Sequence, residues 1–435
     1  MIRIQIPNNN IPERKYIINI IFSEFLGLNY SLHLSDTQNN YLILFGNCEI
    51  VIRDLFFNFY RNSFSYLGLE ALPKKISFLK NVFSTDGDIP VIYGTDELKI
   101  SENKIICGID IFASSFFLLT RWEENVNKVR DLHHRFPGSE SIAFRNNFLH
   151  RPVVNEYVNM LWNMLKRLGF QGERRKKDFE LVLTHDIDAL TYVSFRTLIG
   201  DIIIRRNTKL AIEHSKYLYR HDPYDTYDFL MTSSEKLGLK SHFYFMASNY
   251  KKKYDTGYYL NRSKFKTIIR KIKKRGHIIG FHPGYYTYDD NSRWSYEKQL
   301  LENAIQQEIL EGRQHYLRMD VTKTLPIWDK NSMKIDSTLG FADKEGFRCG
   351  TGDLFSIFDF LNRKQLQLKE RPLILMDGTL RQYQQYTQAQ VSEIIKYYIN
   401  IGNRYNTGVT MLFHNSSFFR EWKGYDRIYR KALNI

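Results

Sequence analysis

The chain has few cysteines, no long hydrophobic run and no glycine-rich nucleotide motif, and each shortage excludes a class of protein. Its three cysteines, Cys48, Cys107 and Cys349, are too few and too scattered for a disulfide framework or a cysteine metal cluster. No stretch reaches the ~18 apolar residues of a membrane span, and residues 1–7 lack the apolar core of a signal peptide. Neither a Walker loop nor a dinucleotide-binding Gly-x-Gly-x-x-Gly is present. We therefore expect a cytoplasmic protein with reduced cysteines and no nucleotide cofactor.

Acidic residues are outnumbered by basic ones, 47 against 62, which gives a net charge of +15 and suggests anionic partners. The densest basic stretch, residues 251–275, has a structural explanation. Apolar residues at helical spacing, Phe265, Ile268, Ile269 and Ile272, predict an amphipathic helix over 263–275 with Ser263 as N-cap and Gly276 as terminator. Because no nucleic-acid-binding module accompanies the charge, an anionic glycan or a lipid-phosphate-linked sugar is the better partner.

One strand-like run ends in two carboxylates. Residues 180–188 show an apolar strand pattern that ends in Asp186 and Asp188. Because side chains alternate along a strand, both carboxylates point the same way and can share one site. A turn followed by a helix N-cap would give the same short pattern.

Four further strand-like runs in the C-terminal half end in a polar reactive group. They lead to His282, Arg318, Asp377 and His414. Parallel strands present all such ends at one face of a sheet, where ligands bind. The convergence of aspartates, histidines and an arginine predicts a hydrolytic metal site.

The order of these motifs resembles divergent polysaccharide deacetylases of the NodB-like carbohydrate esterase class (family 4). The motifs are Thr-x-Asp-x-Asp at 184–188, His-Pro-Gly-Tyr at 282–285, Tyr-Leu-Arg-Met-Asp at 316–320 and Leu-Phe-His at 412–414. The resemblance covers residues 178–435. It implies a bacterial α/β protein with a distorted (β/α)7 barrel that removes an N-acetyl group from an amino sugar in a polysaccharide or glycolipid. It also implies a divalent metal, zinc by preference.

The resemblance assigns a role to each strand-end residue. It makes Asp186 the general base, and it makes Asp188 and His282 metal ligands. In the family, the residue that matches Arg318 orients the base carboxylate, and the residue that matches His414 protonates the departing amine. Asp377 and Asp336 are weaker candidates for tuning that histidine.

The sequence departs from the family pattern at one metal ligand. The second histidine of the metal motif is replaced by Tyr286, which leaves two protein ligands where catalytic zinc usually has three. His185, His315 or Asp290 could complete the set, although His185 should point away from Asp186. Tyr286 or water could bind a different ion instead. In the remaining alternatives the barrel only binds glycan, or it is an amidase for another non-peptide C–N bond.

Aromatic residues follow the strand ends and could stack on sugar rings or pack between loops. They are Tyr285, Tyr286, Tyr288, Trp294 and Trp328. The chain is long enough for more than one core, and we expect three consecutive segments. These are a small α/β domain at 1–115, a helical connector at 116–177 and the barrel at 178–435. The first part resembles the uncharacterised domain that often precedes such deacetylases.

Overall fold

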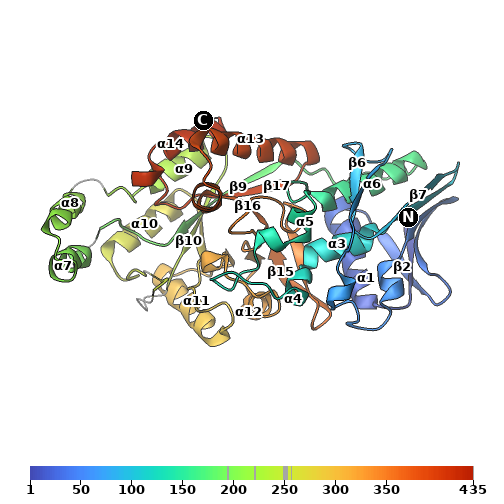
Figure 1. Ribbon diagram of the computed structural model, residues 1–435, viewed down its shortest axis with the longest axis horizontal. Coiled ribbons are helices and arrows are strands. Elements are labelled where there is room, and N and C mark those ends of the chain that lie inside the picture. The colour runs from blue at the N-terminus through green and yellow to red at the C-terminus, as the bar shows by residue number, and fades with distance from the viewer. Residues whose placement is uncertain (194, 220–221, 248–252, 256, 435) are drawn as a thin grey trace. The chain divides into compact units, whose positions relative to one another are not determined.

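The computed structural model describes residues 1–193, 195–219, 222–247, 253–255 and 257–434 (Figure 1). The chain forms two compact units, each built from discontinuous segments. Unit 1 comprises Met1–Glu180, Met319–Ile374 and Asn400–Val409, and unit 2 comprises Leu181–Arg318, Leu375–Ile399 and Thr410–Ile435. Three consecutive segments were expected instead, and residues 319–374 and 400–409 of the expected barrel segment belong to unit 1.

Unit 1 contains a six-stranded sheet with the order β2-β1-β3-β4-β8-β7. Its pairings are mixed, since β1 is parallel to β2 and antiparallel to β3, while β4 is antiparallel to β3 and parallel to β8. The strands are β1 (Ile2–Pro7), β2 (Tyr30–Ser35), β3 (Asn40–Phe45), β4 (Cys48–Arg53), β7 (Gly94–Ile100) and β8 (Lys104–Ile109). A separate antiparallel pair joins β5 (Ser77–Lys80) and β6 (Asp88–Val91).

The helices of unit 1 supply much of its apolar core. Every residue of α3 (Ile111–Thr120) is buried, and α6 (Val153–Arg167) buries one face. The others are α1 (Ile11–Ile18), the π-helix η1 (Asn19–Leu26), α2 (Phe56–Phe59), α4 (Glu123–Val126), α5 (Ile142–Arg145) and α12 (Thr324–Lys330). Strands β13 (Ile335–Asp336), β14 (Phe355–Asp359) and β15 (Lys364–Glu370) also lie in this unit, and β15 pairs with both of the others.

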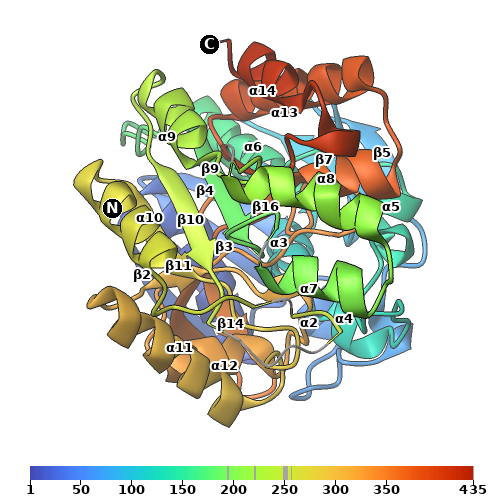
Figure 2. The same cartoon turned by 90° about the vertical axis from the view of Figure 1, so that its left-hand side faces the viewer.

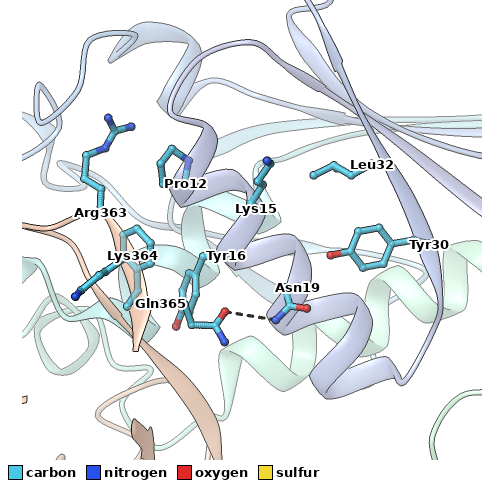
Figure 3. A pocket seen from close by; sticks show the side chains of 10 residues that line it. Pro12, Lys15, Tyr16, Asn19, Tyr30, Leu32, Arg363, Lys364 and Gln365 are labelled. Atoms are coloured by element: carbon cyan, nitrogen blue, oxygen red, sulfur yellow. Dashed lines mark hydrogen bonds between the residues drawn. The ribbon is translucent and has the colours of Figure 1, made fainter. Parts of the chain in front are cut away.

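A pocket of about 410 Å³ lies in unit 1 between α1, η1, β2 and the β14–β15 segment (Figure 3). Its lining combines aromatic, amide and cationic side chains, among them Tyr30, Asn19 and Lys364. Arg363 at its rim is engaged by Glu13, with Nε 2.7 Å from a carboxylate oxygen. The lining residues include no acid or histidine, so this pocket lacks the reactive groups predicted for a hydrolytic site.

Unit 2 carries the strands whose ends were predicted to form the site. Their order is β12-β11-β10-β9-β17-β16, and β9, β10, β11 and β12 pair in parallel. Figure 2 labels β9, β10, β11 and β16 of this set. The strands are β9 (Glu180–Ile187), β10 (Ser241–Phe245), β11 (Ile278–Phe281), β12 (Glu311–Gly312), β16 (Leu373–Met376) and β17 (Gly408–Leu412), and the unit boundary passes through β9, β16 and β17. This mixed α/β arrangement agrees with the predicted class, but the predicted seven-stranded barrel is not confirmed.

Several helices connect or flank these strands. They are α7 (Phe195–Ile203), α8 (Thr208–Tyr219), α9 (Tyr227–Glu235), α10 (Ser263–Lys274), α11 (Asn291–Ile305), α13 (Gln388–Tyr405) and α14 (Tyr425–Leu433). The amphipathic helix expected over 263–275 is confirmed as α10, with the four predicted apolar residues buried. Its N-cap is Arg262, so the prediction for Ser263 was wrong by one residue. In the described part of the chain, no helix is both long and apolar enough to cross a membrane.

A glycine fixes the position of the short strand β12. A Cβ atom on Gly312 would lie 2.0 Å from the main-chain oxygen of Phe281, its partner on β11. Only a residue without a side chain allows the two strands to approach in this way. The residues that follow Gly312 are thereby held at the carboxyl end of β11.

Candidate metal and hydrolytic site

The carboxyl ends of the unit 2 strands carry the predicted acids and histidines. Asp186 lies near the end of β9 and Asp188 directly follows that strand, while His282 follows β11. Asp377 follows β16, and His414 lies two residues beyond β17. The strand expected before Arg318 is instead the 3₁₀ turn His315–Leu317, and the preceding strand β12 leads to Arg313. This shift by five residues changes which side chains reach the site.

Three side chains are close enough to share a metal ion. One ligand atom from each of Asp188, His282 and His315 lies within 4.8 Å of the other two. Oδ1 of Asp188 is 3.2 Å from Nε2 of His282 and 3.6 Å from Nε2 of His315. His315 therefore takes the place that the sequence left open when Tyr286 replaced the second histidine of the motif.

The other ring nitrogen of each histidine is held by an acceptor. Nδ1 of His282 donates to the main-chain oxygen of Arg313 at 2.6 Å, and Nδ1 of His315 donates to Oδ1 of Asp255 at 3.0 Å. Such contacts fix the tautomer and the ring orientation of metal-binding histidines. When a ring is neutral, this contact keeps its proton on Nδ1 and turns the lone pair of Nε2 toward Asp188.

This arrangement of lone pairs fits a cation. Nε2 of His282 is buried and makes no hydrogen bond to a described residue, yet it faces a carboxylate oxygen. A lone pair opposite a carboxylate oxygen is unfavourable unless a proton or a metal ion lies between them. Two imidazole nitrogens and one carboxylate oxygen are also the donor types that catalytic zinc takes.

The electrostatics of the three residues favour a positive charge at the same place. Burial opposes a charge on the ring of His315, but Asp188 and Asp255 outweigh it and raise the pKa of His315 to about 9. Burial also opposes a charge on Asp188, yet His315, His282 and His414 hold the pKa of its carboxyl well below its usual range. A metal ion would compete with protons for these nitrogens.

Asp186 is paired with Arg313. Nη1 of Arg313 donates to Oδ1 of Asp186 at 2.9 Å and to the hydroxyl of Thr184 at 3.0 Å. The guanidinium is fully buried and Asp186 is 2% exposed, so the pair is shielded from water. Oδ2 of Asp186 lies 3.8 Å from Nε2 of His282, which places this carboxylate beside the candidate metal-binding group.

Arg318 was predicted to orient Asp186, and the structure assigns that contact to Arg313 instead. The guanidinium of Arg318 donates to the main-chain oxygen of Tyr285 at 3.0 Å and lies 3.9 Å from the ring centre of Tyr288. The expected strand before Arg318 was wrong, because the strand ends at Gly312 and leads to Arg313. A signal was present in the sequence, since Gly312 marks a close approach of two strands directly before Arg313.

His414 forms a hydrogen-bonded pair with Asp377. Nδ1 of His414 lies 2.8 Å from Oδ1 of the buried Asp377, and the His414 main-chain N–H donates to Oδ2 at 2.7 Å. Burial opposes a charge on the ring, but Asp377, with help from Asp188, raises the pKa of His414 to about 10. Nε2 of this histidine is 3.7 Å from Oδ2 of Asp188. The ring is therefore protonated at neutral pH and faces the site.

The other proposed ligands lie in different surroundings. His185 is fully buried and bonds to the main-chain oxygen of Phe413 and the hydroxyl of Ser241, which agrees with the expectation that it points away from Asp186. Asp290 caps α11 by accepting from the N–H of Arg293. Asp336, suggested as a partner of His414, belongs to unit 1, where it accepts from Thr338.

Aromatic side chains near the site divide into buried and partly exposed ones. Trp294 is fully buried against Phe281, and Trp328 is fully buried in unit 1, so neither offers a free ring face to a sugar. Tyr316 is 36% exposed, and its ring centre lies 4.7 Å from that of His315. Its φ of 62° is a strained backbone conformation for a tyrosine. Strained residues of this kind often lie near functional sites.

One family model matches part of the chain. Residues 2–170 match the model of DUF7033, a family of unknown function, and this match covers less than half of the chain. A search of curated proteins found no match.

Solved structures similar to this chain include the following three. A candidate polysaccharide deacetylase from Mycobacterium smegmatis shares 15% identity at a TM-score of 0.40, over 60% of this chain and 85% of that one. The polysaccharide deacetylase Bc1974 from Bacillus cereus shares 11% at 0.30, over 60% and 86%. A mutant of a CE4 family pseudoenzyme with restored enzymatic activity shares 11% at 0.30, over 59% and 63%. At these TM-scores the structural similarity does not support a conclusion about function, which rests on the candidate site instead.

Proposed function

We propose that the protein is a metal-dependent hydrolase that removes an N-acyl group, acetyl by preference, from an amino sugar in a polysaccharide or glycolipid. The observation that supports this most is the grouping of Asp188, His282 and His315 within 4.8 Å. Asp186 and His414 flank that group, and each has its own buried partner. Amide hydrolysis needs a polarised carbonyl, an activated water and a proton for the amine, and this grouping has a candidate for each.

The donor set fits a divalent ion, zinc by preference. Asp188, His282 and His315 would hold it, and Asp255 and the main-chain oxygen of Arg313 would fix the two histidine rings. When bound, the ion would polarise the acyl carbonyl and lower the pKa of a water molecule. Tyr286 is not needed as a ligand in this arrangement.

Asp186 is the proposed general base. Its carboxylate lies 3.8 Å from the metal-binding nitrogen of His282, so it can accept a proton from water located there. Arg313 fixes the orientation of that carboxylate through the hydrogen bond to Oδ1. Arg313 is thus a positioning residue.

His414 is the proposed proton donor to the departing amine. It carries a proton on each nitrogen at neutral pH, because Asp377 stabilises the imidazolium from the Nδ1 side. The proton on Nε2 faces the site and can be transferred when the C–N bond breaks. Asp377 afterwards keeps the neutral ring in the tautomer that carries its proton on Nδ1.

The assignment to amino sugars depends on the motif order and on the exposed edge of the site. The net positive charge of +15 suits an anionic glycan or a phosphate-linked sugar. Tyr316 presents a partly exposed ring beside His315, where an apolar sugar face could stack.

The test is release of acetate from N-acetylated amino-sugar oligomers after loading with zinc, cobalt, nickel or manganese. We expect Asp186→Asn to lower the rate by about 10² to 10⁴-fold, as removal of a general base does. Asp290→Asn is the matched control, because Asp290 caps α11 and should leave the rate unchanged. Simple acyl amides serve as competing substrates. Turnover of those amides alone would favour an amidase, and sugar binding without turnover under any metal would favour a glycan-binding protein.

A further inference from the structure

The helical hairpin formed by α7 and α8 exposes an unusual number of isoleucines. Ile199 is 55% exposed, Ile203 68%, Ile204 82% and Ile212 63%, and Ile202 is exposed to a similar degree. Ile199, Ile202 and Ile203 have i, i+3, i+4 spacing, so they share one side of α7. Contiguous apolar surface of this kind on a water-exposed element indicates a contact with another phase or molecule.

Exposed cations border these isoleucines. Between the two helices the chain runs through Arg205 and Arg206, and Lys209 and Lys216 lie on α8. Arg205 is neutralised by Asp201. Arg206, Lys209 and Lys216 have no acidic partner among the described residues, and all three are exposed. The surface therefore combines bulky aliphatic groups with unneutralised positive charge.

The hairpin is attached to the end of the unit that bears the candidate site. It begins at Phe195, shortly after Asp188, and the chain returns from it to α9 and then to β10. Tyr192 lies at the base of the hairpin and contacts it, because the Tyr192 hydroxyl lies 3.3 Å from Nε2 of His214 on α8. The ring of Tyr192 packs against Phe419. Phe419 follows His414 by five residues, so two of the chain segments that carry candidate site residues also contact the hairpin.

We propose that this hairpin docks the protein on an anionic lipid bilayer. The isoleucines would enter the boundary between headgroups and acyl chains, and Arg206, Lys209 and Lys216 would contact lipid phosphates. A second copy of the chain is a poorer occupant, because a two-fold contact would bring the unneutralised cations of both copies together. Apolar groups bordered by cations match the chemistry of an anionic membrane surface.

Docking there would present the site to sugars carried on lipids. This step rests on the proposed function and favours a glycolipid over a free polysaccharide as substrate. The docking itself is independent of catalysis, so it can be tested without turnover.

The experiment is sedimentation of the full-length protein with vesicles of phosphatidylcholine alone or with about one third phosphatidylglycerol. We expect binding to the anionic vesicles that weakens as salt is added. Replacing Ile203 and Ile204 by serine should weaken binding at least about ten-fold, since each loses a buried aliphatic side chain. Arg206→Gln with Lys209→Gln should weaken it on the order of 30-fold, at roughly five-fold per charge.

Matched controls change equally exposed residues elsewhere. Leu132→Ser removes an apolar side chain that is 94% exposed in unit 1, and Lys266→Gln with Lys274→Gln removes two exposed charges on α10. Both controls should bind like the wild type. The proposal is overturned if the wild type ignores anionic vesicles at low salt, or if the hairpin variants bind as it does. It also fails if the wild type is a dimer that the isoleucine variant dissociates. Acetate release from a soluble substrate would be unaffected by any of these outcomes.

Discussion

The pairing of Asp186 with Arg313 can be tested by a double-mutant cycle. The changes are Arg313→Met, Asp186→Asn and their combination. Methionine keeps most of the length of the arginine stem and removes its charge. Since both side chains are buried, each single change leaves a buried group without its partner.

The structure sets the expected size of the effect. Arg313 Nη1 makes two hydrogen bonds, to Asp186 at 2.9 Å and to Thr184 at 3.0 Å. Breaking a buried ion pair from one side typically costs about 3–5 kcal/mol, because the remaining charge is left uncompensated. In the double variant no such charge remains, so we expect its cost to fall short of the sum of the single costs by about 2–3 kcal/mol.

Native-state hydrogen exchange, measured on peptides that cover β9, reports the free energy of opening at the strand that carries Asp186. If the free-energy cost of the double variant equals the sum of the two single costs to within about 0.5 kcal/mol, the pairing is refuted. Arg318→Met supplies the matched control, since Arg318 contacts the main-chain oxygen of Tyr285. We expect no coupling between Arg318→Met and Asp186→Asn. Strong coupling there would restore the role that the sequence motif assigned to Arg318.

Three further predictions concern single residues. Gly312→Ala should destabilise unit 2 by more than about 3 kcal/mol in thermal unfolding, because its Cβ would lie 2.0 Å from a main-chain oxygen. Gly276→Ala is the control, since a Cβ there would have no atom within 4 Å. It should cost about 1–2 kcal/mol, because a φ of +72° is unfavourable for alanine. Burial raises the pKa of the Glu297 carboxyl to about 7, so its contribution to the free energy of unfolding is present at low pH and is lost as pH rises through 7. Glu297→Gln should therefore be more stable than the wild type at pH 8, by on the order of 3 kcal/mol in urea unfolding. Equal stability of the two proteins at pH 8 would contradict this. Asp377→Asn should lower the pKa of His414 from about 10, as followed by nitrogen-15 NMR of the ring, and an unchanged pKa would show that another group holds the proton.

Four of the five expected strand ends were predictable, because an apolar run precedes Asp186, His282, Asp377 and His414. The six residues from Val182 to Ile187 are buried in β9, and the alternation of side chains correctly separated Asp186 from His185. The amphipathic spacing within 263–275 likewise predicted α10 and its buried face. These features depend on local periodicity, which a sequence displays directly.

The sequence left the proposed third ligand open, because the position of His315 depends on a strand of two residues. Glu311 and Gly312 are too few to show alternation, and the hydrophobic Tyr316–Leu317 pair suggested a strand where the chain makes a 3₁₀ turn with positive φ. From the sequence, His315 was one of three residues that could complete the ligand set, and nothing favoured it over Asp290. The assignment of residues 319–374 to unit 1 also depends on long-range packing that local patterns do not reveal.

The measurement that tests the central claim most directly is zinc affinity, by competition with a chromogenic chelator, for the wild type, His315→Ala and Tyr286→Phe. The account predicts about one ion per chain, a loss of affinity of at least about 100-fold in His315→Ala, and no change in Tyr286→Phe. Retention of wild-type affinity by His315→Ala would contradict the three-residue site, and failure of the wild type to bind zinc, cobalt, nickel or manganese would contradict the metal-dependent mechanism.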